Sequence, residues 1–578
     1  MDVFKNFWNF LDNKKKIYFF VIVFFSIIQT FFEMIGIAAA IPFVTYLLKP
    51  ESLKDLPYIS NYFDTNNVSS EGNLMLIFCI IFFSIFLIKN FIIIFTNKIS
   101  YKFIYSFRSN LFSNLLKKIL HQEFLFFVKK GISKIFNTTF NEVNIFSVNI
   151  VRPLIIMLTE LLVSIGILFL IIITGNAKGL ILIFPVMVFV GLILKRLNKS
   201  IKSWASIRIK NNEKIINYNL NLINGIKEIL IFGKIKKIVE QFDYSLKSLE
   251  NVDVKNGVVT SYPKALLEQS VILIFIVIIL LMSRMGETND DIIVILSFYL
   301  AAAYRLVPSI NKIFVSYQQI KFGKPSIPKI MEYYNLEKVN KFIENQNSND
   351  SIVFQNKIIL KNISFSYQKD KEIIKNLNLE IFKNKILGIS GKSGSGKSTI
   401  VNLLTGLIKP SDGKIIIDEK NITDPIDLRI YQNLFSITSQ DTYLVDGTIK
   451  DNITFGSSEQ NSLEKLKFAI KFSQLESMIN ESSDGIETYI GSSIKQLSSG
   501  QKQRISIARS IYSDRSILIF DEATNALDQE NEKIIINNLA NLKSKKTIII
   551  ISHNPDNLKI CDSIFKLENK YLVDDSNK

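Results

Sequence analysis

Residues 391–398 read Gly-Lys-Ser-Gly-Ser-Gly-Lys-Ser, which fits the phosphate-loop pattern G-x-x-x-x-G-K-[ST]. An apolar run precedes the loop and a helical pattern follows it, so its backbone N–H groups can turn inward around phosphate oxygens at a helix N-terminus. In that setting Lys397 would reach the β- and γ-phosphates of a nucleotide, and Ser398 would bind Mg²⁺. The predicted phosphate-binding residues are Gly391, Lys392, Ser393, Gly394, Ser395, Gly396, Lys397, Ser398 and Thr399.

Two adjacent carboxylates follow a second apolar run. Residues 517–520 read Ile-Leu-Ile-Phe and predict a buried strand that ends at Asp521 and Glu522. Asp521 would hold Mg²⁺, directly or through water, and Glu522 would orient and polarise the water that attacks the γ-phosphate. Together with the phosphate loop, this pair predicts a site for nucleotide hydrolysis.

Between these elements, residues 497–501 read Leu-Ser-Ser-Gly-Gln and resemble the signature sequence of ATP-binding-cassette (ABC) proteins, which is commonly L-S-G-G-Q. Further elements of this family occur in the expected order. The matching positions are Tyr367 for the aromatic residue that stacks on adenine, Gln440 for the Q-loop glutamine, residues 525–528 for the D-loop and His553 for the switch histidine. The resemblance spans about residues 353–575. It implies that ATP and Mg²⁺ bind here, with Gln440 among the Mg²⁺ ligands, and that Glu522 and His553 act in hydrolysis.

The signature segment has its own expected role. Ser498, Gly500 and Gln501 lie at the predicted start of a helix, which suits a γ-phosphate. In the family this phosphate belongs to ATP held by another subunit, so the resemblance implies a homodimer or a pair with a similar half-transporter. Three positions depart from the family pattern: Ser499 replaces a glycine, Asn525 replaces the commoner serine, and Ser492 stands where the exporter motif T-x-V-G-E has glutamate.

The first half of the chain contains apolar runs that would place the nucleotide site beside a membrane. Six apolar runs of spanning length lie near residues 17–48, 74–95, 153–174, 180–197, 266–282 and 291–313. Two long links rich in Lys and Arg join the second run to the third and the fourth to the fifth, and the positive-inside rule places both in the cytoplasm. We therefore predict a six-span α-helical transmembrane domain of ABC exporter type over residues 1–322, a linker over 323–352, and an α/β P-loop NTPase cassette over 353–578.

Composition narrows the class of protein further. A hydrophobic fraction of 48% is high for a purely soluble protein. The net charge of +17 can indicate a nucleic-acid partner, but a Lys-rich composition and the cytoplasmic loops of a membrane protein account for it, so we expect no nucleic acid. With only two cysteines and two histidines in the chain, neither a disulfide framework nor a zinc site is expected.

The tips of the two cytoplasmic links are predicted contact points. Residues 121–127 indicate a coupling helix that docks on the cassette, and His121 there is assigned no chemistry. Residues 224–229 are similar to a stretch near the second coupling helix of ABC exporters of the type that includes the lipid A flippase. The membrane-first domain order resembles the same exporters.

The sixth run contains Arg305, the candidate residue for substrate binding. A charge in a membrane span is costly and usually functional, and Arg305 could pair with an anionic group such as a pyrophosphate. The alternative is an ion pair with Glu33, Glu160 or Glu268. The segment around Arg305 resembles the sixth span of bacterial lipid-linked oligosaccharide flippases.

The loop over residues 49–72 has a similar resemblance to those flippases. Its apolar side chains fall on one helical face, which predicts an external amphipathic helix that holds a lipid tail; the alternative is a plain exposed loop. The residues on that face are Leu56, Ile59, Tyr62 and Phe63.

We therefore expect an ATP-driven exporter in the bacterial cytoplasmic (inner) membrane that moves an amphipathic, lipidic substrate outward. A polyprenyl-pyrophosphate-linked oligosaccharide is the first candidate, and lipid A-like lipids, drugs or peptides are the alternatives. A soluble-type ABC ATPase acting on nucleic acid or ribosomes is opposed by the six apolar runs. A structural membrane protein with an inactive cassette is opposed by Glu522 and His553.

Overall fold

The structure is a computed structural model of the 578-residue chain. It describes residues 2–39, 71–173, 180–284, 289–337, 354–368, 371–422, 425–455, 462–491 and 497–576. These residues form two compact units, and each is described by itself. The first comprises Met1–Leu120 and Lys130–Glu337, and the second comprises His121–Lys129 and Lys338–Lys578.

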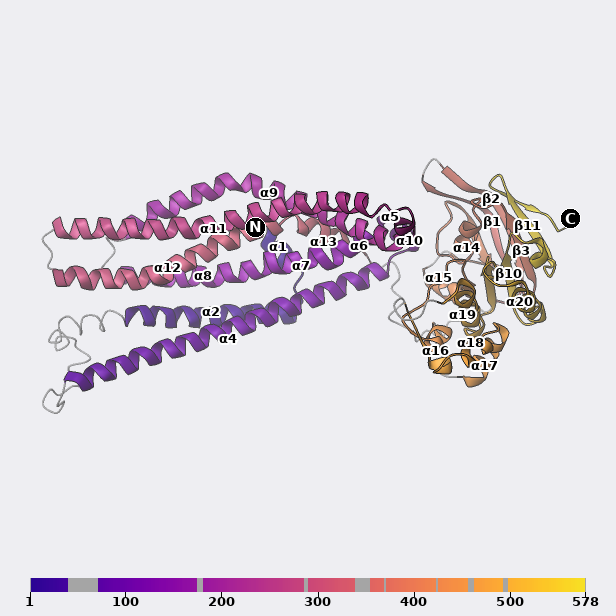
Figure 1. The fold of residues 1–578 in the computed structure, drawn as a ribbon, viewed down its shortest axis with the longest axis horizontal. Coiled ribbons are helices and arrows are strands. Elements are labelled where there is room, and N and C mark those ends of the chain that lie inside the picture. Colours follow the sequence, from indigo (N-terminus) through magenta and orange to yellow (C-terminus); the bar gives the residue numbers. More distant parts are fainter. Residues whose placement is uncertain are drawn as a thin grey trace. The chain divides into compact units, whose positions relative to one another are not determined.

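The first unit is helical, and its long helices run side by side (Figure 1). Its helices are α1 (Asp2–Asn9), α2 (Asn13–Ala38), α4 (Glu71–Leu120), α6 (Ile132–Phe136), α7 (Val143–Phe146), α8 (Arg152–Ile173), α9 (Leu180–Asn224), α10 (Ile226–Ile231), α11 (Ile235–Arg284), α12 (Asn289–Gly323) and α13 (Ser326–Tyr334). Two π-helical turns, Asn137–Glu142 and Ser147–Val151, join α6, α7 and α8 into one continuous path. Helix α2 packs on α4 and α8, and α12 packs on α8, α9 and α11.

Four stretches of the described residues are long and apolar enough to cross a membrane: Asn13–Ala38, Cys79–Leu120, Ile132–Ile173 and Ile235–Leu280. They contain or overlap four of the six predicted spans. The other two predicted spans fall within helices α9 and α12. The end of the first apolar run and nearly all of the predicted lipid-binding loop, over residues 40–70, lie outside the described residues.

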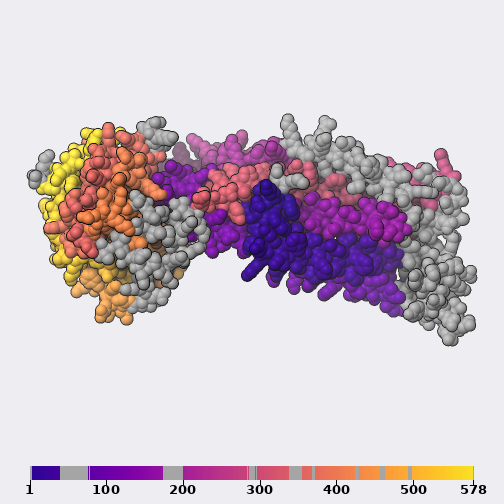
Figure 2. Space-filling view, turned by 180° about the vertical axis from the view of Figure 1, so that it is seen from behind, coloured from indigo at the N-terminus to yellow at the C-terminus, as the bar shows by residue number. Residues whose placement is uncertain are grey.

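The short helix α1 lies against α2 and α4 through aromatic side chains. The Phe7 ring is 5.9 Å from Phe19 and 5.8 Å from Phe107, centroid to centroid, and Phe7 is fully buried. Figure 2 shows α1 and α2 (indigo) together on one face of this unit. The N-terminal segment is thereby anchored to two membrane helices.

Helix α13 changes the expected extent of the linker. It lies inside the segment 323–352, yet Ile330 and Tyr333 are buried and the helix belongs to the first unit. Ordered structure of the first unit therefore continues to Glu337, beyond the boundary expected from composition. The polar sequence after α12 concealed a short amphipathic helix.

The second unit is built on three β-sheets. A six-stranded sheet has the order β12-β11-β3-β10-β9-β6, a four-stranded antiparallel sheet has the order β2-β1-β4-β5, and β7 pairs with β8. The strands are β1 (Lys357–Gln368), β2 (Lys371–Phe382), β3 (Ile386–Gly391), β4 (Asp412–Ile417), β5 (Lys420–Asn421), β6 (Phe435–Thr438), β7 (Gly447–Thr448), β8 (Tyr489–Ile490), β9 (Ile517–Asp521), β10 (Thr547–Ile551), β11 (Ser563–Glu568) and β12 (Tyr571–Asp574).

The second unit also contains helices (Figure 1). They are α14 (Lys397–Leu404), α15 (Pro425–Gln432), α16 (Ile449–Thr454), α17 (Leu463–Phe472), α18 (Glu476–Asn480), α19 (Ser499–Tyr512), α20 (Gln529–Asn541) and α21 (Pro555–Leu558). Helix α19 packs on β6 of the six-stranded sheet, and α16 and α17 pack on α19. All five residues of β10, Thr547–Ile551, are buried, as expected for a parallel strand covered on both faces. Strands β3, β10, β9 and β6 are parallel neighbours, so the loops after them meet at one edge of the sheet.

The segment His121–Lys129, with the start of α5 (Phe124–Lys130), clusters with the second unit. The Leu125 side chain packs against the core of the cassette, and Lys409 Nζ donates a hydrogen bond to Glu123 Oε1 at 2.7 Å. This confirms that the tip of the first cytoplasmic link docks on the cassette.

Candidate functional site

The phosphate loop connects β3 to α14 and depends on its glycines. Gly394 has a φ of 76° and Gly396 a φ of 112°, conformations that L-residues with side chains rarely adopt. A Cβ at Gly396 would also lie 2.9 Å from Ile373 of β2. Residues 392–394 and Ser398 are exposed at the loop surface, whereas Thr399 is buried in α14. The sequence prediction of a strand, a tight loop and a helix is therefore correct in its local structure.

Three charged or titratable side chains from this sheet edge meet at one point. Glu522 Oε1 lies 2.8 Å from His553 Nε2 and 3.6 Å from Lys397 Nζ, and the same histidine nitrogen lies 2.8 Å from Lys397 Nζ. The Lys397 ammonium also donates to the carbonyl oxygens of Gly391 and Lys392. Lys397 begins α14 after the loop that follows β3, Glu522 follows β9 and His553 follows β10, so strand order brings together positions up to 156 residues apart.

Asp521 lies beside this cluster at the end of β9. Burial raises the pKa of its carboxyl above the ordinary value and the neighbouring Glu522 raises it further, while Lys397 and a hydrogen bond with Ser398 act in the opposite direction. A half-buried carboxylate beside a hydroxyl is an oxygen donor set suited to a hard cation such as Mg²⁺. Asp521 and Ser398 therefore fit the metal expected from the sequence.

Two further predicted nucleotide-binding residues, Gln440 and Tyr367, belong to other segments: Gln440 follows β6 of the six-stranded sheet, and Tyr367 lies in β1 of the four-stranded sheet. Gln440 is exposed two residues after β6, whose last residue Thr438 pairs with Phe520 of β9. Tyr367 is near the end of β1, half-buried, with its ring packed edge-on against Phe365. Phe365 pairs with Ile374 of β2, which in turn faces Gly396, so the strand pair brings Tyr367 toward the phosphate loop.

The signature segment forms the start of α19. Ser498 is its N-cap: Ser498 Oγ accepts from Gln501 N at 3.1 Å, and Gln501 Oε1 accepts from Ser498 N at 3.0 Å. Within one chain Gln501 thus closes the helix terminus. A Cβ at Gly500 would lie 2.8 Å from the Ala526 carbonyl oxygen, so this glycine is required for the close approach of the D-loop. Of the three departures from the family pattern, Ser492 lies outside the described residues.

Two further side chains support this site: Glu532, which the sequence did not single out, and Asn525, which it singled out only as a departure from the family pattern. Glu532 Oε1 accepts from Thr524 Oγ1 at 2.8 Å and from Asn557 Nδ2 at 2.7 Å, which ties the loop after β9 to the segment after β10. Asn525 Nδ2 donates to Glu522 Oε2 at 3.1 Å. The amide–carboxylate contact has no sequence signal beyond the unusual residue type at position 525.

Arg305, the candidate substrate residue, is already paired. Its Nε lies 2.8 Å from Glu33 Oε1 of α2, and its guanidinium lies 3.4 Å from Glu160 Oε2 of α8. Lys89 of α4 lies 3.4 Å from Glu33, and Lys312 of α12 lies 2.7 Å from Glu160. We call these five residues the charged chain. Of the three partners considered for Arg305, the structure shows Glu33 and Glu160, whereas Glu268 pairs with Lys264.

A polar cavity of about 620 Å³ lies beside the charged chain, between α2, α4, α8 and α12. Glu33, Glu160, Arg305 and Lys312 line it, together with Arg152. The Arg152 guanidinium donates to Tyr101 Oη at 3.3 Å. The charged chain has three cations against two carboxylates, and Arg152 adds a further positive charge, so this cavity favours an anionic group.

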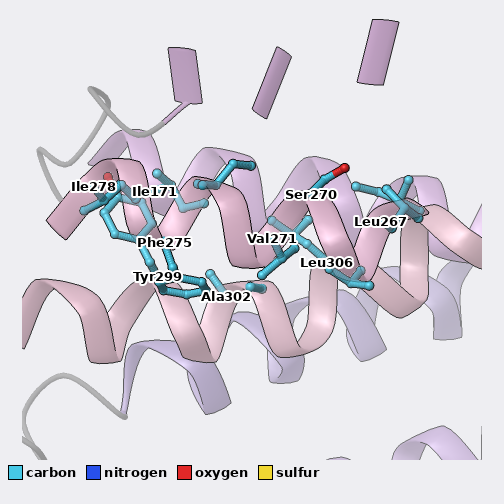
Figure 3. Close-up of a pocket in the computed structure, with 13 residues that line it drawn as sticks. Ile171, Leu267, Ser270, Val271, Phe275, Ile278, Tyr299, Ala302 and Leu306 are labelled. Atoms are coloured by element: carbon cyan, nitrogen blue, oxygen red, sulfur yellow. The ribbon is translucent and has the colours of Figure 1, made fainter. Parts of the chain in front are cut away.

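The other face of α12 borders an apolar pocket of about 70 Å³ (Figure 3). Its walls are side chains of α8, α11 and α12, among them Ile171, Phe275, Ala302 and Leu306. In the close-up, Phe275 and Val271 of α11 lie near Tyr299 and Ala302 of α12, and Leu267 lies at the other end of the pocket, on the side of Leu306. One helix therefore separates a charged cavity from an apolar one.

The fold and this site define a membrane-helix unit joined to a P-loop ATPase cassette. Two family models match the chain: the one described as the ABC transporter transmembrane region matches residues 56–302, and the one described as ABC transporter matches residues 374–525. The chain belongs to the ABC transporters, with a transmembrane region in its N-terminal part and an ATP-binding cassette in its C-terminal part.

Curated relatives match parts of the chain. An ATP-dependent lipid A-core flippase of Idiomarina loihiensis is 36% identical over 218 residues, covering 38% of this chain and 37% of that protein. A leukotoxin translocation ATP-binding protein of Mannheimia glucosida is 39% identical over 223 residues, covering 38% and 31%. In these two comparisons the chain therefore spans about a third of the length of the relative that it matches.

Two other comparisons extend further along the chain. A lipid A-core flippase of Francisella tularensis subsp. holarctica is 27% identical over 395 residues, covering 67% of this chain and 63% of that protein. A solved structure described as a bacterial Atm1-family ABC exporter with ATP bound has a TM-score of 0.77 at 17% identity and covers 97% of this chain and 95% of its own. At that identity the likeness concerns the fold.

Proposed function

We propose that this chain, as one of two subunits, couples ATP hydrolysis to the outward movement of an amphipathic substrate across the bacterial cytoplasmic membrane. The observation that carries the proposal is the meeting of Lys397, Glu522 and His553 within 2.8–3.6 Å at the ends of three strands. A phosphate loop, a carboxylate that can orient water and a histidine are thereby brought to one place.

In the proposed reaction, the water oxygen forms a bond to the γ-phosphorus of ATP, and the bond from that phosphorus to the β–γ bridging oxygen breaks. The products are ADP and inorganic phosphate, and the proton lost from the water ends in the products or solvent. Glu522 orients and polarises the water, Lys397 compensates charge on the phosphates, and His553 holds the γ-phosphate and Glu522 in register.

Asp521, Ser398 and Gln440 are the residues that would hold Mg²⁺. When bound, the cation supplies charge neutralisation between the β- and γ-phosphates. The backbone of residues 391–398 and the ring of Tyr367 bind and orient the nucleotide.

The partner in this proposal is a second copy of the chain or a similar half-transporter. Ser498 caps α19 and Gly500 lies in its first turn, at a helix start that would face ATP bound to the other subunit. The tip of the second cytoplasmic link, α10, also leaves apolar side chains in solvent: Leu230, Ile231 and Phe232 are 58%, 69% and 70% exposed. Such a tip supports docking on a second cassette.

The cargo proposed is a polyprenyl-pyrophosphate-linked oligosaccharide. The polar cavity with excess positive charge supports an anionic head group, and the apolar pocket across α12 supports a lipid component. Because Arg305 is occupied by Glu33 and Glu160, its role in this proposal is to hold the cavity wall, while Lys312 and Arg152 offer charge to the head group. The printed names of the relatives, a lipid A-core flippase and a leukotoxin translocation protein, supply the competing cargo classes.

The test uses the full chain in proteoliposomes. ATPase activity and outward movement are measured with a lipid-linked saccharide, with lipid A and with a peptide, each alongside the Glu522→Gln variant. The proposal expects ATP-dependent movement of the lipid-linked saccharide that the variant lacks. Movement of lipid A or peptide alone would reject the cargo, and failure to hydrolyse ATP would reject the proposal as a whole.

A further inference from the structure

We propose that Asn525 is a positioning residue that fixes the orientation of the Glu522 carboxylate during ATP hydrolysis. This inference rests on the proposed function and deepens it at the same site. It concerns a position where the chain departs from the serine usual in its family.

The two oxygens of the Glu522 carboxylate have different neighbours. Oε1 faces His553 and Lys397, as described above, and Oε2 accepts a hydrogen bond from Asn525 Nδ2 at 3.1 Å. Without the amide, the carboxylate would be held from one side only and could rotate about its last bond. Contacts on both oxygens fix the plane of the group that must orient water.

The backbone reinforces this arrangement. Asn525 N donates to Glu522 O at 3.3 Å, so residues 522–525 form a turn in which both the main chain and the side chain of Asn525 return to Glu522. Glu522 itself has a φ of 50°, in the left-handed region, and its N–H is bonded to Ile551 O at 3.0 Å. A strained residue that neighbours hold on all sides is typical of a site that depends on geometry.

The chemistry of the asparagine side chain suits this role. Its NH₂ group can only donate, it carries no charge that would pair off the carboxylate, and it reaches one bond further from the backbone than a serine hydroxyl. Asn525 is exposed, so its replacement removes no core packing. An effect on hydrolysis can therefore be separated from an effect on folding.

The experiment measures steady-state kcat and KM for Mg-ATP with the full chain in nanodiscs, together with thermal unfolding. Asn525→Ala is expected to lower kcat about tenfold, because one hydrogen bond to a charged group is lost, and to leave KM within about twofold. Asn525→Asp is expected to lower kcat further, because a second carboxylate then faces Glu522. Asn525→Gln keeps the donor and is expected to recover part of the loss.

The matched control is Asn531→Ala. Asn531 Nδ2 also donates to a carboxylate three residues away, Asp528 Oδ1, at 2.7 Å, but it lies in the first turn of α20 away from Glu522. This variant is expected to keep wild-type kcat.

Three results would overturn the inference: unchanged kcat in Asn525→Ala, a raised KM with unchanged kcat, or a smaller loss in Asn525→Asp than in Asn525→Ala. If wild-type protein hydrolyses no ATP, the proposed function fails first and this inference falls with it. The two failures are therefore distinguishable.

Discussion

In both the nucleotide site and the charged chain, opposite charges lie at about the same distances from one another. The two regions differ in whether those charges are available to bind a ligand. In the cassette, Lys397 and Glu522 are 3.6 Å apart at a sheet edge where the adjacent loop surface is exposed. In the helical unit, Arg305 lies 2.8 Å from Glu33, whose side chain is only 2% exposed. Distance therefore does not separate a ligand-binding cluster from a structural one.

The difference lies in the backbone that carries the charges. A helix satisfies its own N–H and C=O groups, so a charge between membrane helices can be compensated only by other side chains. A glycine-rich loop after a parallel strand leaves N–H groups free for a ligand. Charges in the cassette are thus positioned for a phosphate, whereas those among α2, α4, α8 and α12 largely compensate one another.

The largest expected effect falls on the nucleotide site. Glu522→Gln is expected to lower ATPase activity by about 10²–10⁴-fold, because the amide cannot polarise water as the carboxylate does. Binding of ATP should persist, as measured by a nucleotide-dependent rise in unfolding temperature. Glu530→Gln, an exposed acid in the first turn of α20, serves as control, and equal activity in the two variants would contradict the assignment.

The next effect tests the charged chain. Arg305→Ala leaves the nearly buried Glu33 and Glu160 with one lysine each and is expected to cost about 3 kcal/mol in the free energy of unfolding. Thermal or denaturant unfolding in detergent measures it. Lys264→Ala breaks an exposed helical pair with Glu268 and should cost almost nothing.

A second variant separates the two roles of Arg305. The triple change Arg305→Met, Glu33→Gln and Glu160→Gln removes the guanidinium together with both carboxylates, leaves Lys89 and Lys312 without these partners, and should restore part of the stability. If transport returns as well, Arg305 acts through its partners; if only stability returns, its guanidinium contacts the cargo. Equal stability of Arg305→Ala and Lys264→Ala would show that the pairs contribute nothing.

The same contrast explains how far sequence reasoning reached. The phosphate loop, Asp521–Glu522 and the signature segment are contiguous motifs that residue patterns can identify. Parallel strand order brings the first two to one edge of the sheet, whereas the signature segment begins α19. The pairing of Arg305 could be narrowed only to three glutamates, since helix rotation decides which of them it meets. Helix α13 was not predicted from the sequence because it has only nine residues and lies in a polar segment.

The contact of Asn525 with Glu522 could not be predicted for a different reason. It depends on the side-chain conformation of one residue in a turn with positive φ, which no pattern of residue types encodes. Residues 121–127 were predicted to dock on the cassette, but not through which contacts. The pairing of Glu123 with Lys409 could not be predicted, because it joins positions 286 residues apart.

A smaller effect is expected at the closest backbone approach of the nucleotide site. Gly500→Ala places a Cβ 2.8 Å from the Ala526 carbonyl oxygen, so the D-loop or α19 must shift, at about 2 kcal/mol. Both the unfolding temperature and the ATPase rate of this variant should be lower than those of the wild type. Gly257→Ala in α11 has open space around the new methyl group and is expected to be neutral or slightly stabilising. Equal stability in the two variants would show that the approach of α19 to the D-loop is not tight.

The smallest expected effect separates the influence of side-chain burial on an ion pair from that of the distance between its charged atoms. Glu123–Lys409 is as short as Glu160–Lys312, 2.7 Å in both, but Glu123 is 41% exposed and Glu160 only 6%. A double-mutant cycle with Glu123→Ala and Lys409→Ala should give a coupling of about 0.2–1 kcal/mol that falls with added salt, because water and ions screen an exposed pair. The corresponding cycle at Glu160 and Lys312 should be larger and fall less with added salt, because Glu160 is nearly buried although Lys312 is 49% exposed. Equal couplings would mean that geometry alone sets the strength of these ion pairs. The nucleotide site and the charged chain would then differ only in how accessible their charges are to a ligand.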